Sequence, residues 1–184
     1  MLAAAGPMLE SGDLMIRRAD AGDIPALHEL VESAYRGDTA KRGWTHEADL
    51  LGGQRTDHAM LGEIIGDPAQ RILLAEQGGA LTGCVQLSAK GDGIFYLGLL
   101  SVAPAAQAAG LGKRLLQAAE TEASRAGGHA IEMTVIRQRP ELIAYYQRRG
   151  YVLTSEARPF PYGDPRFGHP TRDDLDFVVL VKAL

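Results

Sequence analysis

The sequence has few cysteines, no long apolar run and no excess of basic residues, and each of these absences excludes a class of protein. It contains one cysteine, Cys84, which excludes an internal disulfide framework and any zinc cluster built from cysteines. No apolar run approaches the roughly 20 residues that a helix needs to span a bilayer. Basic residues are not in excess either, since 19 Lys and Arg stand against 23 Asp and Glu, a formal net charge of −4. Because nucleic-acid binding needs a basic face, we expect no nucleic-acid partner. Because no apolar run is long enough to span a bilayer, we also expect no membrane partner.

The composition that is present is typical of a folded domain. Apolar residues make up 46% and charged residues 23% of the 184 residues, which is the mixture and the length of one globular domain. Residues 1–13 are small and aperiodic, and they lack the positive segment and the apolar stretch of a signal peptide. We therefore expect a flexible extension over 1–13, a single domain over 14–184 and a cytoplasmic location.

Hydrophobic periodicity predicts a mixed α/β order of elements. Apolar residues at helical spacing follow Asp23, which we expect to cap a helix with Pro25 in its first turn. The segment 94–102 is almost continuously apolar, so we expect it to be a strand buried on both faces. The expected order is strand 14–18, helices 24–35 and 58–65, strands 71–76, 80–89 and 94–102, helix 110–126, strand 130–136, helix 140–149, and strands 151–155 and 175–182. This order indicates one α/β domain with a mixed sheet.

The segment after the strand 94–102 is the most informative for chemistry. A buried strand leads into a tight loop, and the long helix that follows begins near Gly110. Free backbone N–H groups and the positive end of the helix dipole make such a helix start an anion site. The Walker motif needs glycine where Gln107 stands, and the dinucleotide fingerprint needs glycine where Leu115 stands, so both are excluded. The loop is therefore predicted to hold a pyrophosphate in another way, with Gly110 and Gly112 allowing its close approach.

Two motifs together resemble the GNAT superfamily of acetyl-CoA-dependent N-acyltransferases. Gln107, Gly110 and Gly112 match its loop Gln/Arg-x-x-Gly-x-Gly/Ala, and residues 145–151 (YYQRRGY) resemble its aromatic-Tyr-x-x-x-Gly-Phe/Tyr segment. The resemblance extends over about residues 14–184, and the pair of motifs is far more specific than either alone. It implies the GNAT fold, a mixed central sheet of six to seven strands flanked by about four helices, with acetyl-CoA as cosubstrate and no metal.

The resemblance also implies roles for individual residues. The backbone of Leu100, Ser101 and Val102 would pair with the pantetheine arm like an added strand. Backbone amides would hold the pyrophosphate; these are the amides of Gln107, Ala108, Ala109, Gly110, Leu111, Gly112 and Lys113. Tyr146 matches the tyrosine that protonates the departing thiolate. Its chemistry suits that role, because a phenol is protonated at neutral pH and is able to donate.

Three positions depart from the family's pattern. Ala108 stands where many members have glycine, and Arg139 stands where many have an asparagine that contacts the cofactor. Arg139 is therefore a candidate cofactor-binding residue. Thr134 aligns with the acidic residue that some members use as a general base, and a hydroxyl is no substitute for it. The motifs consequently assign no base.

The acceptor site in this superfamily is built from segments that correspond to residues 35–55 and 158–174. In the first of these, Trp44 is a candidate wall of an apolar or aromatic pocket, and Arg55 is a candidate partner for a carboxylate. Glu47 is a candidate either for attracting an amine or for serving as the base. The alternative is a solvated loop that Trp44 merely anchors. Arg148 and Arg149 are either contacts of the cofactor's 3′-phosphate or surface residues, and Cys84 is expected to be inert core.

These observations favour an N-acetyltransferase that moves an acetyl group to a primary amine. The acceptor is expected to be a small molecule or an amino acid, with a protein N-terminus left open. The alternative function is a non-catalytic sensor that binds acyl-CoA, which Thr134 favours and Tyr146 opposes. Homodimers are common in the superfamily, and that question also stays open.

Overall fold

The computed structural model describes residues 13–36 and 47–184 and shows a seven-stranded sheet. Every neighbouring pair of strands is antiparallel except β5 and β6, which run parallel. Along the sheet the strands are β1 (Met15–Arg18), β3 (Gln70–Gln77), β4 (Ala80–Gly91), β5 (Ile94–Val102), β6 (Ala130–Ile136), β9 (Asp176–Ala183) and β7 (Val152–Pro159). The expected mixed α/β sheet is confirmed. The extension expected over 1–13 lies almost wholly outside the described residues.

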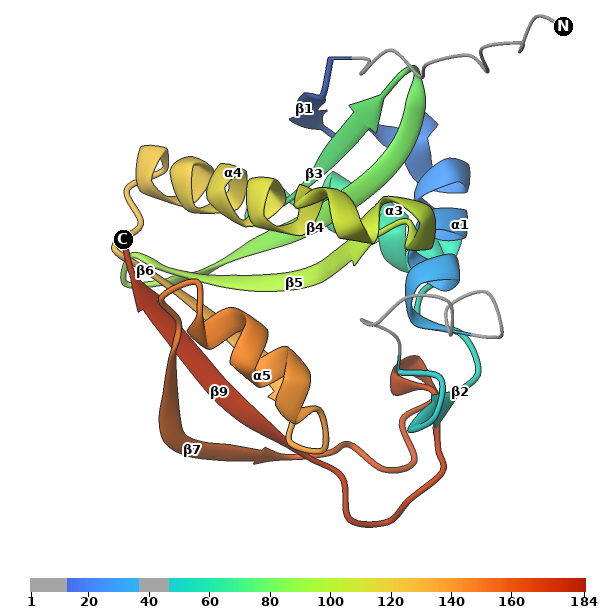
Figure 1. The fold of residues 1–184 in the computed structure, drawn as a ribbon, viewed down its shortest axis with the longest axis vertical. Coiled ribbons are helices and arrows are strands. Elements are labelled where there is room, and N and C mark those ends of the chain that lie inside the picture. Colours follow the sequence, from blue (N-terminus) through green and yellow to red (C-terminus); the bar gives the residue numbers. More distant parts are fainter. Residues whose placement is uncertain (1–12, 37–46) are drawn as a thin grey trace, which may run out of the picture.

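Helices cover both faces of the β1–β5 half of the sheet (Figure 1). The helices are α1 (Ile24–Tyr35), α3 (His58–Gly66), α4 (Leu111–Arg125) and α5 (Pro140–Gln147). Alternation along β3 separates two cores, since Leu73 and Ala75 pack with α4 while Ile72 and Leu74 pack with α1 and α3. The α5 helix joins the α4 side through Tyr145 and Tyr146. No helix among the described residues is long and apolar enough to cross a bilayer.

The strands β5 and β6 separate after a short paired stretch, and this separation creates the site described below. Their register covers only Ile94 to Tyr96 of β5, whereas β6 continues alongside β9 as far as Ile136. In the same part of β5, Leu99 and Leu100 stand opposite one residue of β4, which is a β-bulge. Leu99 adopts a φ of +48° there, a conformation that costs a non-glycine residue about 1–2 kcal/mol. Leu100, in this bulge, lines both cavities described below.

The strand β5 is therefore not buried on both faces, and that expectation was wrong. Leu97 and Leu99 are buried, but Tyr96, Gly98 and Leu100 are only partly covered, in strict alternation. The physical reason is that successive residues of a strand point to opposite faces, and this part of β5 lines a cavity with Tyr96, Gly98 and Leu100 among its lining residues. An apolar run alone does not distinguish a strand between two layers from one that lines a cleft.

Asp23 does not cap α1 through its side chain. It does occupy the N-cap position of α1, and Pro25 lies in the first turn as expected. The Asp20 carboxylate caps the preceding 3₁₀ turn over Ala21–Asp23, where it accepts from the N–H of Gly22 at 2.7 Å. The Asp23 carboxylate instead accepts from the N–H of Asp20 at 2.8 Å and from the Arg17 guanidinium at 2.7 and 2.8 Å. The Asp23 carboxylate is thus used by Asp20 and Arg17 and makes no capping hydrogen bond to α1.

A short two-stranded ribbon joins two loops that are far apart in the sequence. Its strands are β2 (Leu51–Gly52) and β8 (His169–Pro170), and the Thr171 N–H donates to the carbonyl of Leu50 at 2.9 Å beside them. Gly168 permits this approach, because a Cβ there would lie 2.5 Å from the Gly52 carbonyl oxygen. The sequence analysis did not foresee the ribbon. It brings together the two segments that were expected to bind the acceptor.

Candidate active site

Two adjoining cavities lie beside the part of β5 that separates from β6. The larger cavity, of about 120 Å³, extends between β5, β6 and the two loops that the ribbon joins. The smaller cavity, of about 60 Å³, reaches the start of α4. Four residues line both cavities, namely Tyr35, Leu100, Leu142 and Tyr146. A molecule bound in each cavity would therefore meet its partner next to Tyr146.

The smaller cavity is lined by the glycine loop and the start of α4. Gly110 takes a left-handed φ of +72° as the residue before α4, and no side chain caps the helix. The first N–H groups of α4 therefore remain for a ligand, and the helix dipole favours an anion there. A Cβ on Gly110 would meet no atom within 4 Å, so space remains beside these amides. The residues present fit a pyrophosphate.

Gly112 has a second role that the motif does not show. A Cβ on Gly112 would lie 2.6 Å from the hydroxyl of Tyr145. The glycine therefore lets the Tyr145 ring pack against the first turn of α4. Gln107 supports the same loop, because its side-chain amide donates to the carbonyl of Val102 at 3.1 Å.

Arg149 supplies a cation to the smaller cavity, whereas Arg148 is exposed. The Arg149 guanidinium lies 3.4 Å from the centre of the Tyr145 ring, and its Nη1 donates to the Tyr145 carbonyl at 2.8 Å. These contacts hold the positive charge at the cavity wall. The sequence analysis left Arg148 and Arg149 with the same two alternatives, and in the structure Arg149 lines the cavity whereas Arg148 does not.

Several residues of the predicted cofactor set contribute no side chain to either cavity. Ser101 is 1% exposed and its hydroxyl donates to the Leu99 carbonyl at 3.1 Å, and Leu111 is packed in the core. Ala109 and Lys113 are exposed, and the side chain of Ala108 lies outside the described part of the structure. The roles predicted for these residues belong to their backbone groups. The exposure of their side chains therefore does not test those predictions.

Tyr146 is the residue on which both cavities converge. Its side chain is 6% exposed, and its ring makes edge contacts with Tyr145 and Tyr151 at centroid distances of 5.3 and 5.8 Å. Burial raises the pKa of Tyr146 well above the usual phenol value, because a phenolate is poorly solvated there. The Tyr146 hydroxyl therefore keeps its proton throughout the neutral range and is able to donate it.

Tyr35 also lines both cavities where they adjoin. Its hydroxyl donates to the carbonyl of Leu100 at 2.5 Å, at the β-bulge. Burial raises the pKa of Tyr35, so this hydroxyl also stays protonated and acts as a donor. The sequence analysis missed Tyr35, since it ends a helix whose apolar spacing explains it without any function.

The larger cavity carries charged groups on one part of its wall. Glu47 and Arg36 form an ion pair of 2.8 Å, with side-chain exposures of 17% and 5%. Arg55 lies over the Tyr35 ring at 5.3 Å, and the backbone N–H groups of Arg55 and Thr56 are held by the Glu32 carboxylate at 2.7 and 2.8 Å. Glu47 and Arg55 thus both line the cavity as candidates for acceptor binding.

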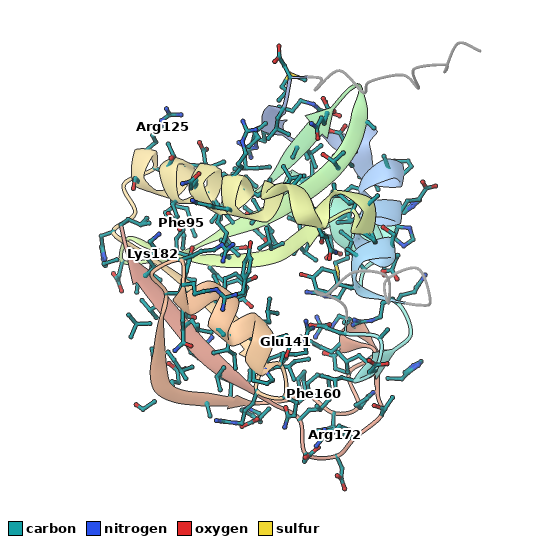
Figure 2. The ribbon with its side chains drawn as sticks, in the orientation of Figure 1. Phe95, Arg125, Glu141, Phe160, Arg172 and Lys182 are labelled. Carbon is teal, nitrogen blue, oxygen red and sulfur yellow. The ribbon has the colours of Figure 1, made fainter. Side chains whose placement is uncertain are left out.

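Arg139 lines the larger cavity and not the smaller one. It is 6% exposed, and its Nε donates to the carboxylate of Glu141, which lies at the start of α5 (Figure 2). Its place favours contact with an acceptor or with the acetyl end of the cofactor over contact with the pyrophosphate. Arg36, which the sequence analysis missed, lies on the same cavity.

Another part of the larger cavity is aromatic. Phe160, labelled in Figure 2 beyond the end of β7, stacks on Phe177 at a centroid distance of 5.6 Å and meets Phe167 edge-on at 6.4 Å.

Thr134 and Tyr96 share a hydrogen bond of 2.7 Å on the cavity wall. Trp44, the predicted apolar wall, lies outside the described residues. Within the described ranges, no group of three His, Cys, Asp or Glu side chains is placed to hold a metal ion.

Comparison with known proteins identifies the family. The family model described as "Acetyltransferase (GNAT) domain" matches residues 45–160, more than half of the chain. The chain belongs to the GNAT family of acetyltransferases. The glycine loop, the start of α4 and Tyr146 all lie inside the matched range of this GNAT domain.

Individual relatives of the GNAT domain differ in the substrates that their names state. An "IAA acetyltransferase" from Azospirillum brasilense is 29% identical over 145 residues, which cover 76% of this chain and 85% of the relative. The ribosomal-protein-S18-alanine N-acetyltransferase of Escherichia coli has a TM-score of 0.68 at 17% identity, covering 93% and 94% of the two chains. The yncA protein of Salmonella typhimurium, solved with its cofactor acetyl-CoA, has a TM-score of 0.65 at 23% identity over 93% and 94%. At these identities the two structures show a shared fold.

Proposed function

We propose that this GNAT domain transfers an acetyl group from acetyl-CoA to a primary amine of a small molecule or an amino acid. The observation that carries the proposal is the position of Tyr146, which lines both the cavity at the α4 start and the cavity between the loops. A donor held in the first and an acceptor held in the second would meet at its hydroxyl. The relative solved with acetyl-CoA supports the choice of donor.

Different residues of the smaller cavity would bind different parts of acetyl-CoA. The first amides of α4 and the Arg149 cation would hold the pyrophosphate, and the backbone of Leu100 to Val102 would align the pantetheine arm. Acetyl-CoA supplies the reactive thioester. The neutral acceptor amine would attack the thioester carbonyl carbon, and the carbon–sulfur bond would break as the carbon–nitrogen bond forms. Tyr146, which stays protonated because burial raises its pKa, would donate its hydroxyl proton to the departing sulfur.

Glu47 is our candidate for the general base. Its carboxylate lies on the wall of the larger cavity and would accept the proton that the acceptor's ammonium group must lose. The backbone around it is well fixed, since the Glu47 N–H donates to the Tyr35 carbonyl at 3.1 Å and its own carbonyl accepts from Leu50 and Leu51. Thr134, hydrogen-bonded to Tyr96, offers no basic group in its place.

Thermal unfolding with acetyl-CoA tests the donor. At about 100 times its Kd, a ligand of the native state adds roughly 2.7 kcal/mol, which raises the Tm of a domain of this size by about 5–10 °C. NAD and ATP, which lack the pantetheine thioester, are the controls. A rise in Tm with acetyl-CoA alone, followed by thiol release with an amine, supports the transferase. A rise without release from any amine favours a sensor, and no rise at millimolar acetyl-CoA refutes both.

A pair of glycine variants tests the anion cradle. Gly110 and Gly127 flank the two ends of α4, both have positive φ (+72° and +83°), and a Cβ on either would meet no atom within 4 Å. Gly110→Ala and Gly127→Ala should therefore lose similar stability, about 1–2 kcal/mol each. Only Gly110→Ala should weaken acetyl-CoA binding, by about tenfold or more, because its methyl group covers amides that hold a phosphate. Calorimetric titration measures this, and equal affinities for the two variants would contradict the cradle.

A further inference from the structure

The larger cavity has an excess of positive charge that its own acids do not balance. Its described lining includes three guanidinium groups, on Arg36, Arg55 and Arg139, and the single carboxylate of Glu47. Arg36 is paired with Glu47, and Arg139 with Glu141. Arg55 makes no ion pair with any acid in the part of the chain that the structure describes, and faces the ring of Tyr35. A partly buried cation without an acid favours an anionic ligand.

The same cavity provides an apolar surface away from these charges. Phe160, Phe167 and Phe177 contribute rings that contact one another and line the cavity. Such rings stabilise an apolar or aromatic group by burial and by edge contacts. The cavity volume of about 120 Å³ is sufficient for several water-sized groups, which is consistent with a small acceptor.

Arg55 contacts Tyr35, a residue that lines both cavities. Tyr35 lies at the junction of the two cavities beside Tyr146, and Arg55 lies directly over the Tyr35 ring. An amine at the junction and an anion on Arg55 would therefore both lie beside the Tyr35 side chain. An α-amino acid suits this arrangement, because one carbon atom carries both its amine and its carboxylate.

We propose that the acceptor is an α-amino acid with an apolar or aromatic side chain, that Arg55 binds its carboxylate, and that the phenylalanine cluster binds its side chain. This proposal rests on the transferase function above and specifies its acceptor. Because Arg36 is paired with Glu47 and Arg139 with Glu141, Arg55 carries the unbalanced charge of this described lining, and a positive charge there disfavours polyamines, which carry several positive charges. A protein N-terminus lacks the carboxylate, because that group is an amide in a chain.

Three matched acceptors test the proposal: L-phenylalanine, L-phenylalaninamide and phenethylamine. All three present a primary amine and the same ring, and only the first carries a carboxylate. In a thiol-release assay with acetyl-CoA we expect kcat/KM for phenylalanine to exceed the other two by about 10- to 100-fold, the value of a charge-assisted pair. The preference should also hold for leucine against leucinamide.

Arg55→Gln identifies the residue responsible. Glu32 holds the backbone of Arg55 and Thr56, so the loop should keep its course without the guanidinium. We expect the ratio of kcat/KM for phenylalanine to that for phenethylamine to fall by about tenfold or more, with Arg55→Lys restoring part of it. Arg71→Gln is the matched control, because Arg71 also lies over a ring, that of Phe95, and lines neither cavity. It should leave the ratio unchanged.

The outcomes separate this proposal from the function on which it rests. Equal rates for the acid, the amide and the amine would overturn the amino-acid acceptor while leaving an acetyltransferase. Turnover of polyamines or of peptide N-termini, with none of free amino acids, would overturn it in the same way. Absence of both acetyl-CoA binding and turnover would instead overturn the transferase itself.

Discussion

Replacing Tyr146 with phenylalanine should lower kcat by about 10²–10⁴-fold, the usual contribution of a general acid. The substitution removes only the hydroxyl from a buried ring, so KM for acetyl-CoA and the Tm should change little. Because burial raises the pKa of Tyr146 well above the usual value, the wild-type acid stays protonated up to about pH 10. Rates measured between pH 6 and 10 should therefore show no alkaline loss from this residue.

Tyr151→Phe is the control for that experiment. Tyr151 is also buried, its ring lies 5.8 Å from that of Tyr146, and its hydroxyl bonds to Glu120 at 3.1 Å, but it lines neither cavity. It should keep the wild-type kcat. If Tyr146→Phe also keeps it, the leaving thiolate takes its proton from another source, and Tyr146 has only a packing role.

Replacing Glu47 with glutamine should lower kcat/KM by about 100-fold at neutral pH if the carboxylate is the base. Glutamine keeps a side-chain oxygen that accepts from the Arg36 guanidinium, so the ion pair becomes a hydrogen bond and the loop retains its anchor. The loss should diminish as the pH rises, because more of the acceptor amine is then already neutral. Steady-state rates over pH 6–10 measure this.

Glu76→Gln is a matched control, since Glu76 pairs with Arg17 at 2.6 Å on a part of the sheet that lines neither cavity. It should leave kcat/KM unchanged while altering stability by a similar amount. An unchanged pH–rate profile in Glu47→Gln would assign Glu47 to holding Arg36 in place, and a water would have to remove the proton.

The parts of the site that the sequence predicts well are local in the chain. The glycine loop, the start of α4 and the two adjacent tyrosines follow one another closely, and a motif captures the backbone geometry that they need. The order of strands and helices also follows from apolar spacing, because each element buries one face against its neighbours. Hence the seven-stranded sheet and its helices could be expected before any coordinates.

The parts that could not be predicted depend on contacts between distant segments. The aromatic cluster joins Phe160, Phe167 and Phe177 from a strand end, a 3₁₀ turn and the last strand, and each has an ordinary structural explanation in its own segment. The bulge places the positive φ on Leu99 and not on the neighbouring Gly98, where a sequence would suggest it. Arg139 lies on the larger cavity because α5 begins beside it, which a motif alignment does not reveal.

Because β2 and β8 join two loops, the two cavities are built from largely different parts of the chain. The walls that would hold the donor come from β5, α4 and α5, whereas much of the acceptor wall comes from two loops fastened to each other by strands of two residues. Loops tolerate substitution and insertion far better than the elements that they connect. Exchange of these two loops as a unit would therefore change which amine is selected and leave the acetyl donor the same, so the scaffold can diversify its acceptors without rebuilding its chemistry.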